Sequence, residues 1–89
     1  MVRMYVRHPV SNFANWKQAY DDFDAERRGM GVVGDAVFQS TADPNDVTVW
    51  HDFESEQSAR AFLDSPRLKE VMESAGVAED PSIWLTTQA

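Results

Sequence analysis

The sequence predicts an α+β fold in which four strands form one antiparallel sheet and helices cover a single face of that sheet. Three observations lead to this prediction. Polar and apolar residues alternate in several short segments, as in strands, and longer segments have the period of a helix. A turn joins the second and third strands directly. The resulting order, strand-helix-strand-strand-helix-strand, is the ferredoxin-like topology, here as one domain covering 1–89.

The first half of this pattern consists of a strand at 2–8 and a helix at 12–28. Pro9 ends the strand because proline cannot donate to a strand ladder. Aromatic residues then recur at steps of three and four, which indicates one buried stripe of a helix. We expect Ser11 to cap the start of this helix, and Gly29 with a second glycine two residues later to end it.

The middle of the chain predicts an antiparallel hairpin of two strands, at 32–40 and 47–53. The segment 42–46 between them contains Asp, Pro and Asn. The Asp and Asn side chains accept local backbone hydrogen bonds, and proline presets φ, so this composition favours a turn.

A second helical region and a last strand complete the pattern. Ser55 is expected to cap the first helical segment, and Ser65 with Pro66 begins another, as cap and first helical position. Gly76 closes that segment, and 82–86 is the fourth strand. Since crossover connections are right-handed, both helical regions should lie on the same face of the sheet.

Composition limits the classes of function that the protein can have. The net charge is −7 and the eight Lys and Arg residues are scattered, so we expect no nucleic-acid binding, which needs a clustered basic face. The absence of cysteine excludes disulfides and is compatible with a cytoplasmic protein. No segment approaches the roughly 20 apolar residues that span a bilayer, so we expect no membrane association.

The sheet face opposite the helices is predicted to be aromatic. It should carry Tyr5, Trp50 and Trp84, mixed with Arg3 and Arg7. An apolar patch of this kind marks an interface, and two such faces packed together would form a homodimer with two-fold symmetry. The alternative is that these aromatic residues simply suit strands and remain partly solvated.

Several short segments spread over essentially the whole chain resemble a known superfamily. They are Val6-Arg7-His8, Phe13-Ala14-Asn15-Trp16-Lys17, Arg27-Arg28-Gly29-Met30-Gly31, Asp43-Pro44-Asn45-Asp46, Trp50-His51-Asp52-Phe53, Ser65-Pro66-Arg67-Leu68 and Met72 with Ala75-Gly76-Val77. With the order of elements, they resemble the dimeric α+β barrel superfamily, which includes antibiotic-biosynthesis-monooxygenase-like proteins and small polyketide cyclases. The resemblance implies a homodimer whose two sheets form a barrel, with one pocket per subunit between sheet and helices.

The resemblance covers several reaction types, and some fit this chain poorly. Haem-degrading members place a haem-ligating histidine on the second long helix, whereas 66–75 contains none. Monooxygenase-type members use Asn and Trp in the pocket, which Asn15 and Trp16 resemble. Adjacent helical residues point about 100° apart, so at most one of the two can face a pocket.

The two histidines are the candidate catalytic residues. His8 and His51 fall on the helix-facing side of the two central strands, so we expect their imidazoles to lie close together near the mouth of the pocket. Histidine gives and takes protons near neutral pH, which makes His8 the candidate acid or base and His51 an assisting group. The alternative is that each is a hydrogen-bonded structural residue.

Seven further residues are predicted to line a substrate pocket, most of them because they are aromatic or apolar and face the sheet. They are Trp16, Tyr20, Phe23, Arg27, Phe53, Phe62 and Met72. Arg27 would bind a carboxylate or phenolate with its planar fork, or would instead neutralise a helix C-terminus. For the aromatic residues, the alternative is an ordinary hydrophobic core.

These observations favour a small-molecule enzyme, namely a cofactor-independent monooxygenase, cyclase or isomerase acting on an aromatic or polyketide-like compound. We expect no cofactor, because a phosphate-binding glycine loop is missing, and no metal, because the histidines lack the spacing of a metal site. Two alternatives remain open. One is a non-catalytic ligand-binding or stress-associated dimer of the same fold, and the other is a structural dimer whose cavity is filled by its own side chains.

Overall fold

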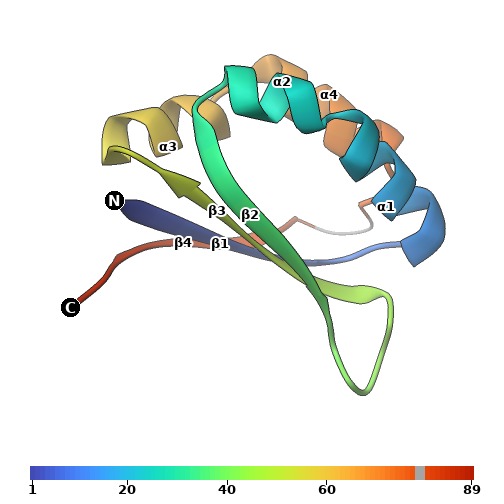
Figure 1. Ribbon diagram of the computed structural model, residues 1–89. Coiled ribbons are helices and arrows are strands. Elements are labelled where there is room, and N and C mark those ends of the chain that lie inside the picture. The colour runs from blue at the N-terminus through green and yellow to red at the C-terminus, as the bar shows by residue number, and fades with distance from the viewer. Residues whose placement is uncertain (78–79) are drawn as a thin grey trace.

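A computed structural model, which describes residues 1–77 and 80–89, confirms the predicted α+β class. The chain forms one four-stranded antiparallel sheet with the order β2-β3-β1-β4, so β1 and β3 are central as predicted. All the helices lie over one face of this sheet (Figure 1). The strands are β1 (Val2–Pro9), β2 (Val32–Gln39), β3 (Asp46–Phe53) and β4 (Ser82–Thr87).

The helical cover consists of four helices among the described residues. They are α1 (Phe13–Asp22), α2 (Asp24–Gly29), α3 (Glu56–Leu63) and α4 (Pro66–Ser74). The prediction of one continuous helix at 12–28 is therefore wrong. At Phe23 the backbone N–H lies 3.1 Å from the carbonyl oxygen of Ala19 and 3.3 Å from that of Tyr20, the tightening that ends a helix. The break lets the Arg27 guanidinium hydrogen-bond the Tyr20 carbonyl.

The cap of α1 is Asn12 rather than the predicted Ser11. The Asn12 side-chain oxygen accepts from the N–H of Asn15 at 3.0 Å. Ser11 is held elsewhere, since its N–H donates to the carbonyl of Gly76 at 3.0 Å. These two segments of the chain approach so closely that a β-carbon on Gly76 would lie 2.6 Å from the Ser11 hydroxyl, and Gly76 itself has φ of +80°. Only glycine suits that position.

The other predicted caps are confirmed. Ser55 accepts from the N–H of Ser58 at 3.2 Å, and Ser65 accepts from the N–H of Leu68 at 3.4 Å. The left-handed glycine after α2 is Gly31, with φ of +103°, whereas Gly29 is the last residue of the helix.

The hairpin turn positions the start of α1. Asp43 accepts from the N–H of Asn45 at 2.9 Å, which confirms the predicted turn, and Asn45 accepts from the N–H of Phe13 at 3.0 Å. β2 ends at Gln39, one residue before the predicted end.

The core lies between the sheet and the helices and forms two clusters. One contains Met4, Val6, Val32, Phe53, Ala59 and Phe62, and the other contains Val10, Trp16, Val47 and Val49. Three polar residues are buried beside these clusters, namely His8, Arg27 and His51. Three buried ionisable side chains are unusual in so small a core, because such side chains are seldom buried unless they are paired.

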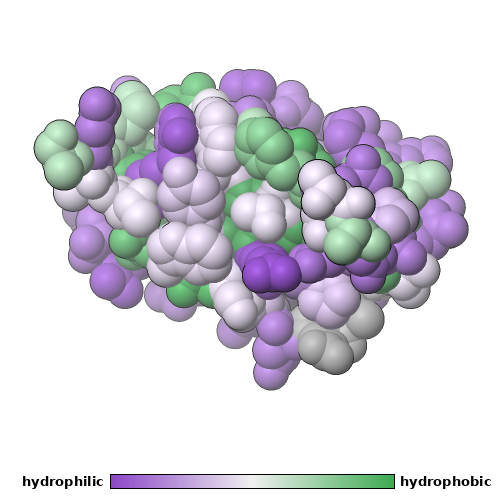
Figure 2. Space-filling model, turned by 90° about the horizontal axis from the view of Figure 1, so that it is seen from below, coloured by the Kyte–Doolittle hydropathy of each residue, from purple (hydrophilic) through white to green (hydrophobic). Residues whose placement is uncertain are grey.

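The opposite face of the sheet carries the predicted aromatic residues. The ring of Tyr5 stacks on Trp84 with centroids 5.4 Å apart, and the guanidinium of Arg3 lies 3.8 Å from the centre of the Trp50 ring. Trp84 is 45% exposed and Phe38 is 52% exposed. Figure 2 shows this face, where pale and green residues gather over the sheet with purple residues among and around them. Much aromatic surface is therefore open to solvent in the single chain.

Candidate functional site

A cavity of about 70 Å³ lies between the sheet and the helices. Eight of the nine predicted site residues line it, from β1, β3 and all four helices: His8, Trp16, Tyr20, Phe23, Arg27, His51, Phe62 and Met72. The rest of the lining is apolar and comes chiefly from the sheet and α4. The cavity is therefore apolar with a few polar groups, the composition that is typical of small-molecule sites.

Phe53 is the predicted lining residue that does not reach the cavity. Its side chain is fully buried in the core and packs against Phe62, with ring centroids 5.4 Å apart. Asn15 does not line the cavity either, because it is exposed while the adjacent Trp16 is buried. The two side chains diverge as the geometry of a helix requires.

The expectation that the two imidazoles lie close together is wrong. The register of the central strands pairs His51 with Met4 and His8 with Val47, so the two histidines are four residue pairs apart along the antiparallel ladder. At about 3.3 Å per residue, this offset separates the two backbone positions by more than 10 Å. The histidines therefore face different parts of the same cavity.

Two aromatic residues on one face of α1 bridge the space between the histidines. The ring of Trp16 meets His8 edge-on, with centroids 5.5 Å apart. The ring of Tyr20 lies 6.1 Å from that of His51, and Trp16 and Tyr20 stack on each other at 5.0 Å. Because Trp16 and Tyr20 are four residues apart, the helix places them one above the other.

Burial keeps both histidines neutral. It lowers the pKa of His8 below the ordinary value of 6.5. Burial, together with the positive charge of Arg27, lowers the pKa of His51 to about 4. The Nδ1 atoms of both rings are buried and have no hydrogen-bond partner within residues 1–77 and 80–89. A neutral imidazole has one unprotonated nitrogen, and that nitrogen can accept a proton from a bound molecule.

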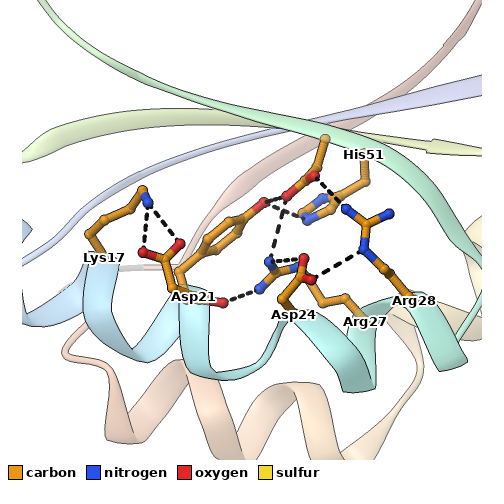
Figure 3. Close-up of polar contacts among 8 residues, drawn as sticks. Lys17, Asp21, Asp24, Arg27, Arg28 and His51 are labelled. Carbon is orange, nitrogen blue, oxygen red and sulfur yellow. Dashed lines mark hydrogen bonds and ion pairs between the residues drawn. The ribbon is translucent and has the colours of Figure 1, made fainter.

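The polar end of the cavity is a group of four side chains, Tyr20, Arg27, Asp35 and His51, which we call the tyrosine cluster. The Tyr20 hydroxyl donates to Asp35 Oδ2 at 2.5 Å and lies 3.4 Å from His51 Nε2 (Figure 3). The Arg27 guanidinium carbon lies 3.6 Å from the centre of the Tyr20 ring. Burial and the bond to Asp35 raise the pKa of Tyr20, so it remains a neutral phenol.

Arg27 is tied into the structure by several groups. It is 2% exposed, and Nη2 lies 3.2 Å from Asp24 and 3.5 Å from Asp35. It donates to the Tyr20 carbonyl in the last turn of α1. The sequence suggested that Arg27 neutralises the C-terminus of its own helix, whereas the carbonyl that it binds belongs to the preceding helix. Its Nε atom has no partner among the described residues, so one donor stays available for a ligand oxygen.

Asp35 is the member of the cluster that the sequence reasoning missed. It lies on β2 opposite His51, so both side chains face the helices. The signal was present in the sequence, because a carboxylate on the side of a strand that also carries Val37 is a charge placed on the core face. A charge in that position is rare unless it is paired.

Tyr20 and Arg27 also form part of a second surface. They line a groove between α1, α2 and β2 together with Lys17, Asp21, Asp24, Asp35, Ala36 and Val37. Lys17 and Asp21 form an ion pair of 2.7 Å there (Figure 3). Tyr20 and Arg27 line both spaces, so they lie between the cavity and the polar groove.

Within residues 1–77 and 80–89, no three His, Cys, Asp or Glu side chains lie where they could share a metal ion. No helix in that part of the chain is both long and apolar enough to cross a membrane.

The chain has the fold of the antibiotic-biosynthesis-monooxygenase-like proteins. A scan against protein-family models gives no match, and a search of curated proteins gives none. Among solved structures, a protein from Bordetella bronchiseptica described as an antibiotic biosynthesis monooxygenase superposes with a TM-score of 0.83 at 18% identity, covering 99% of this chain and 96% of that chain.

Two proteins from Streptomyces have the same architecture. SnoaB from Streptomyces nogalater, a cofactor-independent oxygenase, has a TM-score of 0.80 at 15% identity and covers 99% of this chain and 92% of its own. The monooxygenase ActVA-Orf6 from Streptomyces coelicolor, in complex with the ligand nanaomycin D, has a TM-score of 0.70 at 22% identity, covering 99% and 87%. The resemblance noted in the sequence is therefore confirmed at the level of the fold.

Proposed function

We propose that this protein is an enzyme of the dimeric α+β barrel type, a cofactor-independent monooxygenase, cyclase or isomerase that acts on an aromatic or polyketide-like compound. The observation that carries the proposal is the pair of buried neutral imidazoles, His8 and His51, which line one otherwise apolar cavity. The activity of SnoaB and the ligand of ActVA-Orf6 support the substrate class by analogy of fold.

The chemistry begins with proton removal. A neutral imidazole takes a proton from a phenol or an activated carbon, and the electron pair stays on the substrate. The free donor of Arg27 stabilises the negative oxygen of the resulting anion. Trp16 and Tyr20 offer flat faces for an aromatic substrate. The electron-rich anion then reacts with oxygen, closes a ring or shifts a double bond, according to the substrate.

Substrate entry requires the cavity to enlarge. Sites for drug-sized ligands have volumes of roughly 300–1,000 Å³, and this cavity has about 70 Å³. The wall with the fewest constraints is α4, which contains no buried residue although Leu68, Val71 and Met72 line the cavity. An outward movement of α4 would admit a ring-sized molecule without disturbing the sheet.

We also propose that the protein is a homodimer. The open face of the sheet carries the stacked Tyr5 and Trp84 and the Arg3–Trp50 pair, and the helices all lie over the opposite face (Figure 1). Covering these rings with the same face of a second chain would remove apolar surface from water in both subunits.

The proposed reaction is tested with anthrone, whose activated methylene group loses a proton readily and whose anion reacts with oxygen. Oxygen uptake is measured with an electrode for the wild type and for His8→Ala and His51→Ala. Loss of a general base lowers the rate about 10²- to 10⁴-fold, and at least one variant should show it. Phe53→Leu is the control, because Phe53 is buried but does not line the cavity. Full turnover by both histidine variants would contradict the proposal.

The small cavity favours a second candidate, a ligand-binding dimer without turnover. Such a protein would bind anthrone saturably, as measured by fluorescence titration, and would consume no oxygen above the rate in buffer. A panel of phenolic compounds with an increasing number of rings extends this test. If members of the panel bind and none of them is turned over, the protein is a ligand-binding dimer instead.

A further inference from the structure

The tyrosine cluster contains a chain of polar contacts that begins at Asp35 and ends at His51. The Tyr20 hydroxyl is the middle member, 2.5 Å from Asp35 Oδ2 and 3.4 Å from His51 Nε2. Each member comes from a different element, since Tyr20 is on α1, Asp35 on β2 and His51 on β3. The tertiary structure therefore brings together a carboxylate, a phenol and an imidazole, joined by the two contacts that the dashed lines of Figure 3 mark.

The proton of Tyr20 decides the direction of this chain. A phenol has one proton to donate, and a carboxylate can only accept. Asp35 is a carboxylate, because it forms ion pairs with Arg27 at 3.5 Å and with Arg28 at 3.8 Å. The Tyr20 proton is thus committed to Asp35, and the Tyr20 oxygen can only accept from His51.

The same count of protons assigns the tautomer of the His51 imidazole. If the Tyr20 oxygen accepts from His51, the proton of the neutral ring is on Nε2. A neutral imidazole carries a single N–H, so Nδ1 has a lone pair and no proton. This Nδ1 is buried and no group within residues 1–77 and 80–89 donates to it.

We infer that Asp35 is a positioning residue which, through Tyr20, holds His51 in the tautomer protonated at Nε2 and leaves Nδ1 as the free base of the cavity. The inference rests on the proposed function, and it names the nitrogen that takes the proton. In that step the O–H or C–H bond of the substrate breaks and a bond forms between Nδ1 and the proton. The electron pair stays on the substrate, and His51 becomes a cation whose Nε2–H donates to Tyr20.

The groups around His51 suit a base that is neutral at rest. Arg27, from α2, disfavours the cation, whereas Asp35, from β2, and Asp52, the next residue along β3, favour it. Phe62, from α3, covers the ring with centroids 5.3 Å apart and brings no charge. When the imidazole takes up a proton, the negative charge of Asp35 stabilises the resulting cation, and the Tyr20 hydroxyl lies between the two groups.

His8 has no comparable chain. Its ring meets Trp16 edge-on, and the charged group that acts on it is Asp46, at the start of β3. No polar side chain among the described residues holds either of its nitrogens in a hydrogen bond. The structure therefore assigns the base to His51 rather than to His8, which the sequence favoured.

The tautomer is measured by NMR of the ¹⁵N-histidine-labelled protein at neutral pH, where protonated and unprotonated ring nitrogens have distinct shifts. The chain has two histidines, so His8→Gln assigns the signals. We expect wild-type His51 to be protonated at Nε2. In Asp35→Ala the Tyr20 hydroxyl loses its acceptor and turns to Nε2, so the form protonated at Nδ1 should become the larger population.

Two variants show whether Asp35 acts through Tyr20. In the Tyr20→Phe background, Asp35→Ala should leave the tautomer unchanged, because the intermediate oxygen is absent. Asp52→Asn is the charge control, since it removes a neighbouring carboxylate that is paired with Arg3 on the other face of the sheet. It should leave the tautomer as in the wild type.

A wild-type His51 protonated at Nδ1 would overturn the inference, and so would an Asp35→Ala spectrum identical to that of the wild type. The first of these measurements is made on the wild-type protein and uses His8→Gln only to assign its signals, so a folding defect of Asp35→Ala cannot obscure it. No substrate is present in either. A failed tautomer test therefore removes the role of Asp35 while anthrone turnover stands, and a failed turnover test removes the proposed function while the tautomer result stands.

Discussion

Arg67 of α4 and Glu26 of α2 form a two-point ion pair that holds the outer helix over the cavity. The Nε and Nη2 atoms of Arg67 donate to the two carboxylate oxygens of Glu26 at 2.8 Å and 3.0 Å. Since α4 has no buried residue, this pair and the half-buried Leu68, Val71 and Met72 attach the helix to the rest of the chain. The ion pair acts as a latch on the wall of the cavity.

Glu26→Gln should loosen α4. The neutral amide cannot form the two-point ion pair, so the backbone amides of α4 should exchange with deuterium faster than in the wild type, by a few-fold because exposed ion pairs are weak. Hydrogen–deuterium exchange with mass spectrometry measures this. Glu56→Gln is the matched control, since it breaks an ion pair with Arg60 that lies within α3. Equal exchange of α4 in both variants would show that the latch is not there.

Tyr20→Phe should destabilise the fold by about 1–2 kcal/mol, because Asp35 loses a donor and the cavity end loses a hydrogen bond. Urea denaturation with tryptophan fluorescence gives the free energy of unfolding. Tyr5→Phe is the control, because its ring keeps the stack on Trp84 at the open face. A larger loss in Tyr5→Phe than in Tyr20→Phe would contradict the importance of the buried phenol.

The stability of the protein should fall as the pH is lowered from 7 to 5. In the folded state the pKa of His51 is about 4, below its ordinary value of 6.5. The unfolded chain therefore binds more protons in this window, so stability is full above about pH 6.5 and is lost as the pH falls toward 4. By pH 5 the loss from His51 is about 2 kcal/mol.

This pH dependence can be attributed to individual residues by urea denaturation at pH 7, 6 and 5. His51→Gln should flatten most of the slope, and His8→Gln a part of it, because burial lowers the pKa of His8 as well. The paired carboxylates of Asp46 and Asp52, whose pKa values are lowered by Arg7 and Arg3, lose their contribution at lower pH than this window. An unchanged slope in His51→Gln would disprove the assignment.

Trp84→Lys should convert the proposed dimer to a monomer. The substitution puts a charge in the centre of the exposed aromatic face and removes the stack on Tyr5. Analytical ultracentrifugation should give about 20 kDa for the wild type, twice the 10.1 kDa of one chain, and the single-chain mass for the variant. Ala61→Lys, at an exposed position of α3 on the other side of the sheet, is the control and should stay dimeric. A wild type that sediments as a single chain at micromolar concentration would refute the dimer.

The sequence by itself determined the order of strands and helical regions and the face of each strand, because local interactions set them. Alternation assigned the face of each strand, so the burial of His8 and His51 on the helix side was predicted correctly. Hydroxyl caps at Ser55 and Ser65 set helix starts, since those bonds join residues three positions apart. The aromatic open face followed from the same alternation.

The tertiary structure alone decided how these elements meet. The offset of His8 from His51 depends on the register of β1 against β3, which the period of two leaves undetermined. The placement of Asp35 against Tyr20 depends on contact between α1 and β2, through residues that are 15 positions apart in the chain. The site is thus a product of long-range contacts, since a proton chain needs distances of about 3 Å that periodicity cannot specify.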